Sequence, residues 1–143
     1  MNYLVFLDAH AGELEKILSG VKSMVVKELD PARSVEQFVR VGDNLYFLRN
    51  NDECAVRVKA TVVRVLPSEN STEEDLSQIL KELQPRLQLT EDQYNYWSEK
   101  KQVLFIEFEA AHKVLEFHIA TGRITDRKAW IAFEEIHEVI EKE

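Results

Sequence analysis

The residues best suited to bind an anion are cations in the first half of the chain. Lys22 and Lys27 lie five positions apart, and Arg49 follows at the end of an apolar run. An ammonium is a compact positive charge with three donors, so it suits a phosphate group. Arg57 and Lys59 fall on one face of an expected strand, because side chains two positions apart point the same way. Together these cations predict a basic surface that binds a phosphate-bearing ligand.

Each of these cations also has a structural interpretation, which stays open at this point. Lys22 follows the first expected helix and could stabilise the negative end of its dipole. Arg57 and Lys59 could form an ordinary solvated face of a sheet.

Aromatic and basic residues also occur together further along the chain. Tyr94, Tyr96 and Trp97 precede Lys100 and Lys101. Proteins that bind single-stranded nucleic acid stack bases on aromatic rings and hold phosphates with cations. Tyr94 and Trp97 are therefore candidate stacking residues, although aromatic residues at helical spacing also pack against a protein core.

Catalytic chemistry has less support in the sequence. Asp8 and His10 follow the first expected strand and could exchange a proton, but a histidine at a strand end usually serves as a polar cap. Cys54 is the single cysteine and has no base nearby in sequence, which favours a small buried apolar role. The four histidines lack metal-ligand spacing, and no nucleotide-binding or hydrolase motif is present. We expect neither a metal nor a cofactor.

The elements that must position these residues alternate along the first half of the chain. A buried strand over 3–7 precedes a helix over 11–19, because Leu14, Ile17 and Leu18 recur at helical spacing and Gly20 ends the pattern. The segments that follow read, in order, as a strand at 24–26, a turn at 41–43, a strand at 45–48, a turn at 50–52 and a strand over 55–66 with a bulge at 62–63.

The second half begins with an acidic segment, about residues 67–99, which we call the helical insert. It carries eight acids and two bases, and so most of the net charge. One helix starts near Ser71-Thr72 and ends at Pro85, and a second runs from Thr90 to near Trp97. The elements after it are a central strand over 102–109, a strand at 114–119, a turn at 120–122, a strand at 130–133 and an acidic helix over 134–142.

This order predicts an α+β fold: a small curled sheet or barrel with flanking helices and a helical insertion. A chain of 143 residues suits one domain, 1–143, with an extension at about 110–143. The net charge of −8 excludes a globally basic nucleic-acid coat, yet residues 22–64 alone stand at +2. One cysteine, and no signal or membrane-spanning pattern, lead us to expect a cytoplasmic protein that does not bind membranes.

The first part of this pattern resembles the ASCH domain, a branch of the PUA-like superfamily. The likeness covers about residues 3–109 and includes a Gly20-Val21-Lys22 turn and a VGD turn, here 41–43, before the strand LYFL. The family often shows Gly-x-Lys-x-x-Glu-x-Arg, whereas this chain has Val25 and Lys27 at the last two positions. The enzymatic branch has a hydroxyl nucleophile where Val25 stands.

The resemblance implies a binding module that accepts RNA or a nucleotide-like small molecule in a cleft edged by Lys22 and Lys27. An alternative is a small amidohydrolase acting on a modified nucleoside, with Lys22 as the activating cation and either Ser23 or an acid from the helical insert assisting. Val25 argues against it, so we lean away from an enzyme. A third interpretation is a protein-interaction domain in which the acidic insert docks on a basic partner. The sequence does not determine the oligomeric state.

Overall fold

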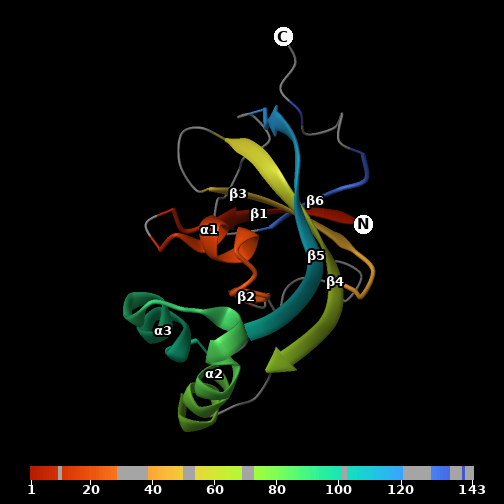
Figure 1. The fold of residues 1–143 in the computed structure, drawn as a ribbon. Helices are drawn as coiled ribbons and strands as arrows, with labels where there is room; N and C mark the ends of the chain where they lie inside the picture. The colour runs from red at the N-terminus through yellow and green to blue at the C-terminus, as the bar shows by residue number, and fades with distance from the viewer. Residues whose placement is uncertain are drawn as a thin grey trace.

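The computed structural model describes residues 1–9, 11–28, 39–49, 54–68, 73–100, 103–120, 130–135 and 140. Within these residues, six strands form one sheet in the order β2-β5-β4-β3-β1-β6. The sheet is curled, and three helices lie beside it, which confirms the predicted α+β architecture (Figure 1). In chain order the elements are β1 Asn2–Leu7, α1 Glu13–Leu18, β2 Met24–Glu28, β3 Asn44–Arg49, β4 Ala55–Ser68, α2 Glu73–Leu87, α3 Glu91–Ser98, β5 Val103–His118 and β6 Ile131–Phe133.

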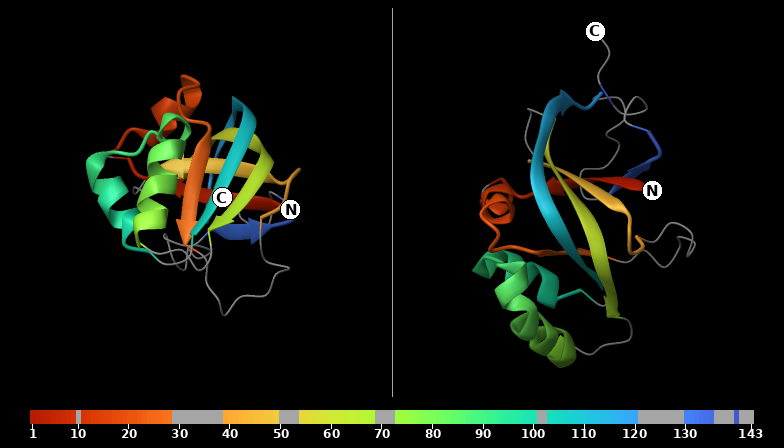
Figure 2. Two further views of the ribbon diagram at one scale, coloured as in Figure 1. Left: turned by 90° about the horizontal axis from the view of Figure 1, so that it is seen from below. Right: turned by 45° about the vertical axis from the view of Figure 1, so that its right-hand side comes forward.

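Strand pairing brings the start of the chain into the sheet. β1 pairs in parallel with β3, which requires a crossover, and α1 and β2 lie within that connection. Every other pairing between the described strands is antiparallel. β4 and β5 are the longest strands and run side by side as a bent pair through the whole molecule (Figures 1 and 2).

The alternation of side chains along the strands produces cores on both faces of the sheet. Tyr3, Val5 and Leu7 point to the inner face, where they meet Leu14 and Ile17 of α1. The intervening residues of β1 and β3 point to the opposite face and form a second cluster with β6 and the end of β5. We call these the inner face and the outer face. Both faces are therefore covered, which fits strands that are apolar at successive positions.

The helical insert covers a different part of the outer face. α2 and α3 connect β4 to β5 and pack on β2 and β5 at the lower end of the sheet (Figure 2). The third cluster comprises Met24, Leu76, Leu80, Leu87, Leu89, Val103 and Phe105. As predicted, Thr90 caps α3: its hydroxyl accepts from Gln93 N at 3.2 Å, and the Gln93 side chain accepts from Thr90 N at 3.0 Å.

Three predicted boundaries were wrong. α2 does not end at Pro85 but continues to Leu87. A proline inside a helix removes one donor and crowds the carbonyl four residues back, which can bend the helix without ending it. Residues 103–118 form one strand rather than two, because Ala110 takes a positive φ of 58° and the strand bulges instead of breaking.

The third correction concerns the predicted C-terminal helix. Glu134 and Glu135 form a bend, and Ile140 makes an antiparallel bridge with Ile119. At these positions the helical spacing of apolar residues was misleading, because Ile140 meets the sheet in an extended backbone. The predicted bulge at 62–63 is confirmed by a register shift between Val62 and Arg64. The rest of that helix, His10 and the turn at 50–52 lie outside the described residues.

No helix in the described part of the chain has both the length and the apolar character needed to cross a membrane.

Candidate functional site

Lys22 is buried beneath the helical insert. Gly20, with φ of 86°, turns the chain away from α1, and Lys22 then points inward with 2% of its surface exposed. Its Nζ donates to the carbonyl oxygen of Leu87 at the end of α2 and lies 3.4 Å from Glu13 Oε1. Burial lowers the pKa of Lys22 from its ordinary value, and the nearby Glu13 carboxylate opposes this effect. The sequence prediction placed this lysine beside the end of α1, and its backbone N–H does donate to Lys16 O of α1 at 3.1 Å, whereas its ammonium contacts the end of α2.

Glu13 connects this lysine to the first strand. The Glu13 carboxylate is also buried, and its Oε2 accepts a hydrogen bond of 2.6 Å from Asp8 N. Asp8 in turn accepts from Ala11 N at 3.3 Å through its Oδ1. The end of β1, the start of α1 and the residues just before β2 are thus joined through the Glu13 carboxylate, a connection that no local pattern in the sequence predicts.

Carbonyl groups at the end of α2 and just beyond it accept hydrogen bonds from α1 and from the α1–β2 connection. Arg86 O accepts from Ser23 N at 3.0 Å, and Gln88 O accepts from Lys16 Nζ at 3.0 Å. Together with the bond from Lys22 to Leu87, these contacts satisfy carbonyl groups that a helix end leaves without intrahelical donors. Ser23 and Lys22 share no hydrogen bond among the described residues.

Lys27 belongs to the inner face. In the register of β2 with β5, Lys27 lies opposite Leu104, whose side chain is in the inner cluster. The Lys27 Nζ lies 5.1 Å from the centroid of the Trp130 ring, and that centroid is 6.2 Å from the centroid of the Tyr3 ring. Burial raises the pKa of Tyr3, the carboxylate of Asp43 raises it further, and the guanidinium of Arg40 lowers it.

Arg49 lies on the same face, at the end of β3. It is in register with Leu7, and its guanidinium forms an ion pair with Glu15 on α1. The hydrogen bond from Arg49 lowers the pKa of the exposed Glu15 carboxyl. Lys27 and Arg49 therefore flank the inner core from two different elements.

Arg57 and Lys59 are directed elsewhere. Lys59 is in register with Tyr46, and its Nζ lies 5.5 Å from the centroid of that ring on the outer face. Arg57 lies where the register of β4 and β5 shifts, and it forms a 2.7 Å ion pair with Glu116. The prediction that Arg57 and Lys59 share a face assumed that side chains alternate regularly along β4, and the register shift interrupts that alternation. The predicted cations therefore do not converge on one surface.

The candidate stacking residues pack against the third cluster. Tyr94 donates from its hydroxyl to Ser77 O at 3.2 Å, and Trp97 lies against the same apolar side chains. The exposed ring of this helix is Tyr96, with 44% of its surface exposed and Lys100 Nζ 4.5 Å from its centroid. The helical period predicts this arrangement: Tyr94 and Trp97, three positions apart, share one face of the helix, and Tyr96 lies on a different face.

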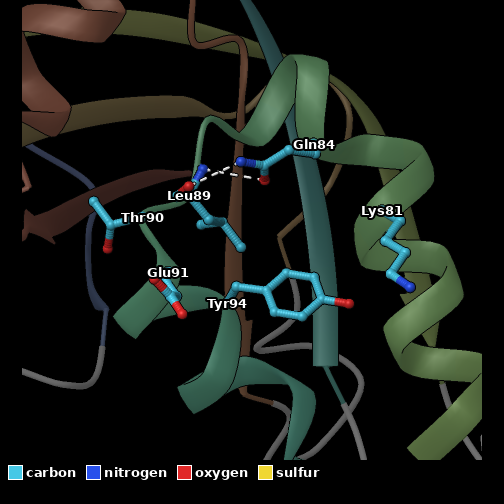
Figure 3. A pocket seen from close by; sticks show the side chains of 6 residues that line it. All are labelled: Lys81, Gln84, Leu89, Thr90, Glu91 and Tyr94. Atoms are coloured by element: carbon cyan, nitrogen blue, oxygen red, sulfur yellow. Dashed lines mark hydrogen bonds between the residues drawn. The ribbon is translucent and has the colours of Figure 1, made fainter.

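A shallow pocket of about 340 Å³ lies between α2 and α3 (Figure 3). Its lining residues are Lys81, Gln84, Leu89, Thr90, Glu91 and Tyr94. The Gln84 side chain is bonded to the backbone of Leu89 in both directions, at 2.8 and 3.2 Å, so its polar groups are already used. Within the described ranges, no three acidic, histidine or cysteine side chains gather closely enough to hold a metal ion.

Two further groups were missed from the sequence. Trp130 was expected only as the start of a strand, yet its ring is the one that meets Lys27. Arg86 was counted among the few bases of an acidic segment, yet it shares Glu107 with Arg64 on the outer face. Both contacts join residues far apart in the chain, so no local pattern could reveal them.

No protein-family model matches the chain, and no curated protein sequence matches it. Solved structures do. An ASCH protein from Zymomonas mobilis is 9% identical with a TM-score of 0.68, over 94% of this chain and 88% of that chain.

Two variants from Zymomonas mobilis give similar values. The serine-to-alanine variant is 11% identical with a TM-score of 0.63, over 82% of this chain and 73% of that chain. The tyrosine-to-phenylalanine variant is 11% identical with a TM-score of 0.62, over 82% and 75%. Identities this low show the fold alone, and they agree with the resemblance in the sequence: the chain has an ASCH-like fold.

Proposed function

We propose that the protein binds RNA or a nucleotide-like ligand at the inner face of the sheet. The observation that carries this proposal is the contact of Lys27 with Trp130, beside the ring of Tyr3. An ammonium is attracted to the face of an aromatic ring. The Trp130 ring is buried, with 9% of its surface exposed, whereas Lys27 is half-buried, so the Lys27 ammonium is the group that a phosphate of the ligand would contact.

The other predicted contacts take different parts in this proposal. Arg49 offers a second cation from the same face, with Glu15 as its resting partner. Lys22 acts indirectly, because its buried ammonium fixes the start of β2, the strand that carries Lys27. Arg57 and Lys59 would contact only an RNA long enough to extend beyond the inner face. The ASCH-like fold supports the proposal, since the resemblance implies a PUA-like module for such ligands.

The fluorescence of Trp130 gives a direct test. The sequence contains one other tryptophan, Trp97, so the Trp97→Phe variant leaves Trp130 as the single indole. This variant is titrated at low salt with short single-stranded RNAs and with mononucleotides. We expect saturable quenching, with an affinity that falls steeply as salt is raised, because phosphate contacts release counterions.

Charge-removing variants in this background identify the contact. Lys27→Gln should weaken RNA binding by about fivefold to tenfold and reduce the slope of log affinity against log salt by about one. Lys81→Gln removes the same charge from the exposed side of α2 and should change neither quantity. Fluorescence that responds to no RNA or nucleotide, or equal losses in both lysine variants, contradicts the proposal.

A further inference from the structure

We propose that Arg64 and Arg86 form a second anion site, on the outer face, which binds a phosphate monoester in place of the Glu107 carboxylate. This site lies apart from the inner face and uses residues that play no part in the function proposed above. The ligand class is a terminal phosphate, carried either by a free nucleotide or by the 5′ end of an RNA.

The two arginines converge on a single oxygen atom. Arg64 Nη2 and Arg86 Nε each lie 3.1 Å from Glu107 Oε2. Two guanidinium groups held within hydrogen-bond distance of one oxygen are the arrangement that binds the oxygens of a phosphate group. The Glu107 carboxylate therefore occupies the position that an anionic ligand would take.

The backbone on both sides of this site is fixed. Arg64 directly follows the register shift of β4 and is in register with Glu107 on β5. Arg86 belongs to the last turn of α2, where its own carbonyl accepts from Ser23 N at 3.0 Å. The neighbouring carbonyl of Leu87 is held by the buried Lys22. Both guanidinium groups thus extend from anchored positions, which lowers the entropy lost when a ligand binds.

The charges favour a ligand with two negative charges. Two guanidinium groups against one carboxylate leave the cluster with an excess of one positive charge. In the described part of the chain, neither arginine has another ion-pair partner. A phosphate monoester carries about −1.5 to −2 charges at pH 7 and three acceptor oxygens, so it can neutralise both arginines at once. A phosphodiester carries a single negative charge, so it would neutralise only one of the two arginines.

Glu107 is also placed so that it can be displaced. All three side chains are partly exposed, with both arginines more accessible than the glutamate. Exposed ion pairs contribute little to stability, so exchanging one anion for another costs the fold little. The Glu107 side chain can rotate toward solvent once the phosphate is bound between the two arginines.

The test uses the full chain and phosphate probes that do not depend on the inner face. Inorganic phosphate is titrated while the arginine Nε–Hε signals are followed by NMR. Two short RNAs of the same sequence are then compared, one with a 5′ phosphate and one with a 5′ hydroxyl. We expect phosphate to shift the signals of Arg64 and Arg86, and the 5′-phosphorylated RNA to bind about tenfold more tightly than its hydroxyl counterpart.

Removing the competing carboxylate gives an outcome that a purely structural ion pair does not predict. Glu107→Gln should strengthen phosphate binding by about fivefold, because the phosphate then no longer has to displace a carboxylate from its partly exposed ion pairs. Glu109→Gln removes the same charge from a neighbouring exposed position of β5 and should have a smaller effect. Arg64→Gln and Arg86→Gln should each reduce the affinity about tenfold, with unfolding temperature measured to confirm that the variants fold.

The outcomes separate this site from the function proposed above. Phosphate binding that needs both arginines, without any quenching of Trp130, supports this site and contradicts the inner-face proposal. Quenching of Trp130 together with no phosphate shift at either arginine contradicts this site alone. A Glu107→Gln variant that binds phosphate no better than the wild type, or worse, overturns the assignment.

Discussion

Replacing Lys22 with methionine should destabilise the protein strongly. The variant removes the ammonium that donates to Leu87 O and leaves the buried Glu13 carboxylate without its cation. Breaking a buried ion pair by removing one partner costs about 3–5 kcal/mol, because an uncompensated charge stays out of water. Natural domains have a total stability of about 5–15 kcal/mol, so this loss should be a large fraction of the whole.

Urea denaturation followed by circular dichroism measures this loss, because the free energy of unfolding extrapolates linearly to zero denaturant. Lys16→Met is a matched control: Lys16 also donates to a carbonyl near the end of α2, at Gln88, but it is only half-buried. We expect it to cost about 1 kcal/mol, the typical net value of one hydrogen bond. The double variant Glu13→Gln with Lys22→Met should recover part of the loss, because it removes the unpaired charge while the amide oxygen of the new side chain can still accept from Asp8 N.

A loss of about 1 kcal/mol or less for Lys22→Met, equal to that of the control, would refute the reasoning. It would mean that the Glu13 carboxylate is hydrated or protonated at little cost once the lysine is gone. A double variant that is less stable than Lys22→Met alone would refute it as well, since the residual charge could not then be the source of the loss.

Two more predictions concern the same turn. Burial lowers the pKa of Lys22 below 10.5, so the unfolded chain binds more protons than the folded chain between the two pKa values, and stability from this residue rises with pH there. The unfolding free energy of the wild type minus that of Lys22→Met should therefore grow as the pH rises toward 10.5, whereas a difference that shrinks contradicts the lowered pKa. Gly20→Ala places a Cβ where no atom lies within 4 Å, but at φ of 86°, so it should cost about 1–2 kcal/mol by backbone strain alone. Ser19→Ala, at a φ of −77°, is the control, and the stability of both variants is measured by thermal unfolding. If both variants lose the same stability, backbone strain at Gly20 is not the cause.

Local signals in the sequence identified the elements well. Thr90 preceding Glu91 and Asp92 correctly predicted the start of α3, and Gly20 correctly marked the end of α1. These predictions succeed because a cap or a stop depends on residues within one turn of each other. Pro85 failed as a stop, because a proline inside a helix can bend it without ending it.

The spatial arrangement of the predicted cations could not be predicted from such local signals. Whether Lys59 and Lys27 share a face depends on the register of three strands, β2, β5 and β4, and on shifts within β4. Each shift of one residue moves side chains to the opposite face, and the sequence shows no such shift beyond the one predicted at 62–63. The burial of Lys22 depends on where α2 ends in space, which is decided by packing of the third cluster.

The hydrogen bond from Lys22 to Leu87 also bears on how this chain could change by deletion. Loops between antiparallel strands normally tolerate shortening, and β4 and β5 are adjacent, so a short turn could replace the whole helical insert geometrically. Here such a deletion would strip a buried ammonium of its backbone acceptor and expose the apolar side of β2 and β5. The helical insert is therefore structurally obligatory, and a shortened version of this chain would need an apolar residue at position 22 and polar replacements beneath the lost helices.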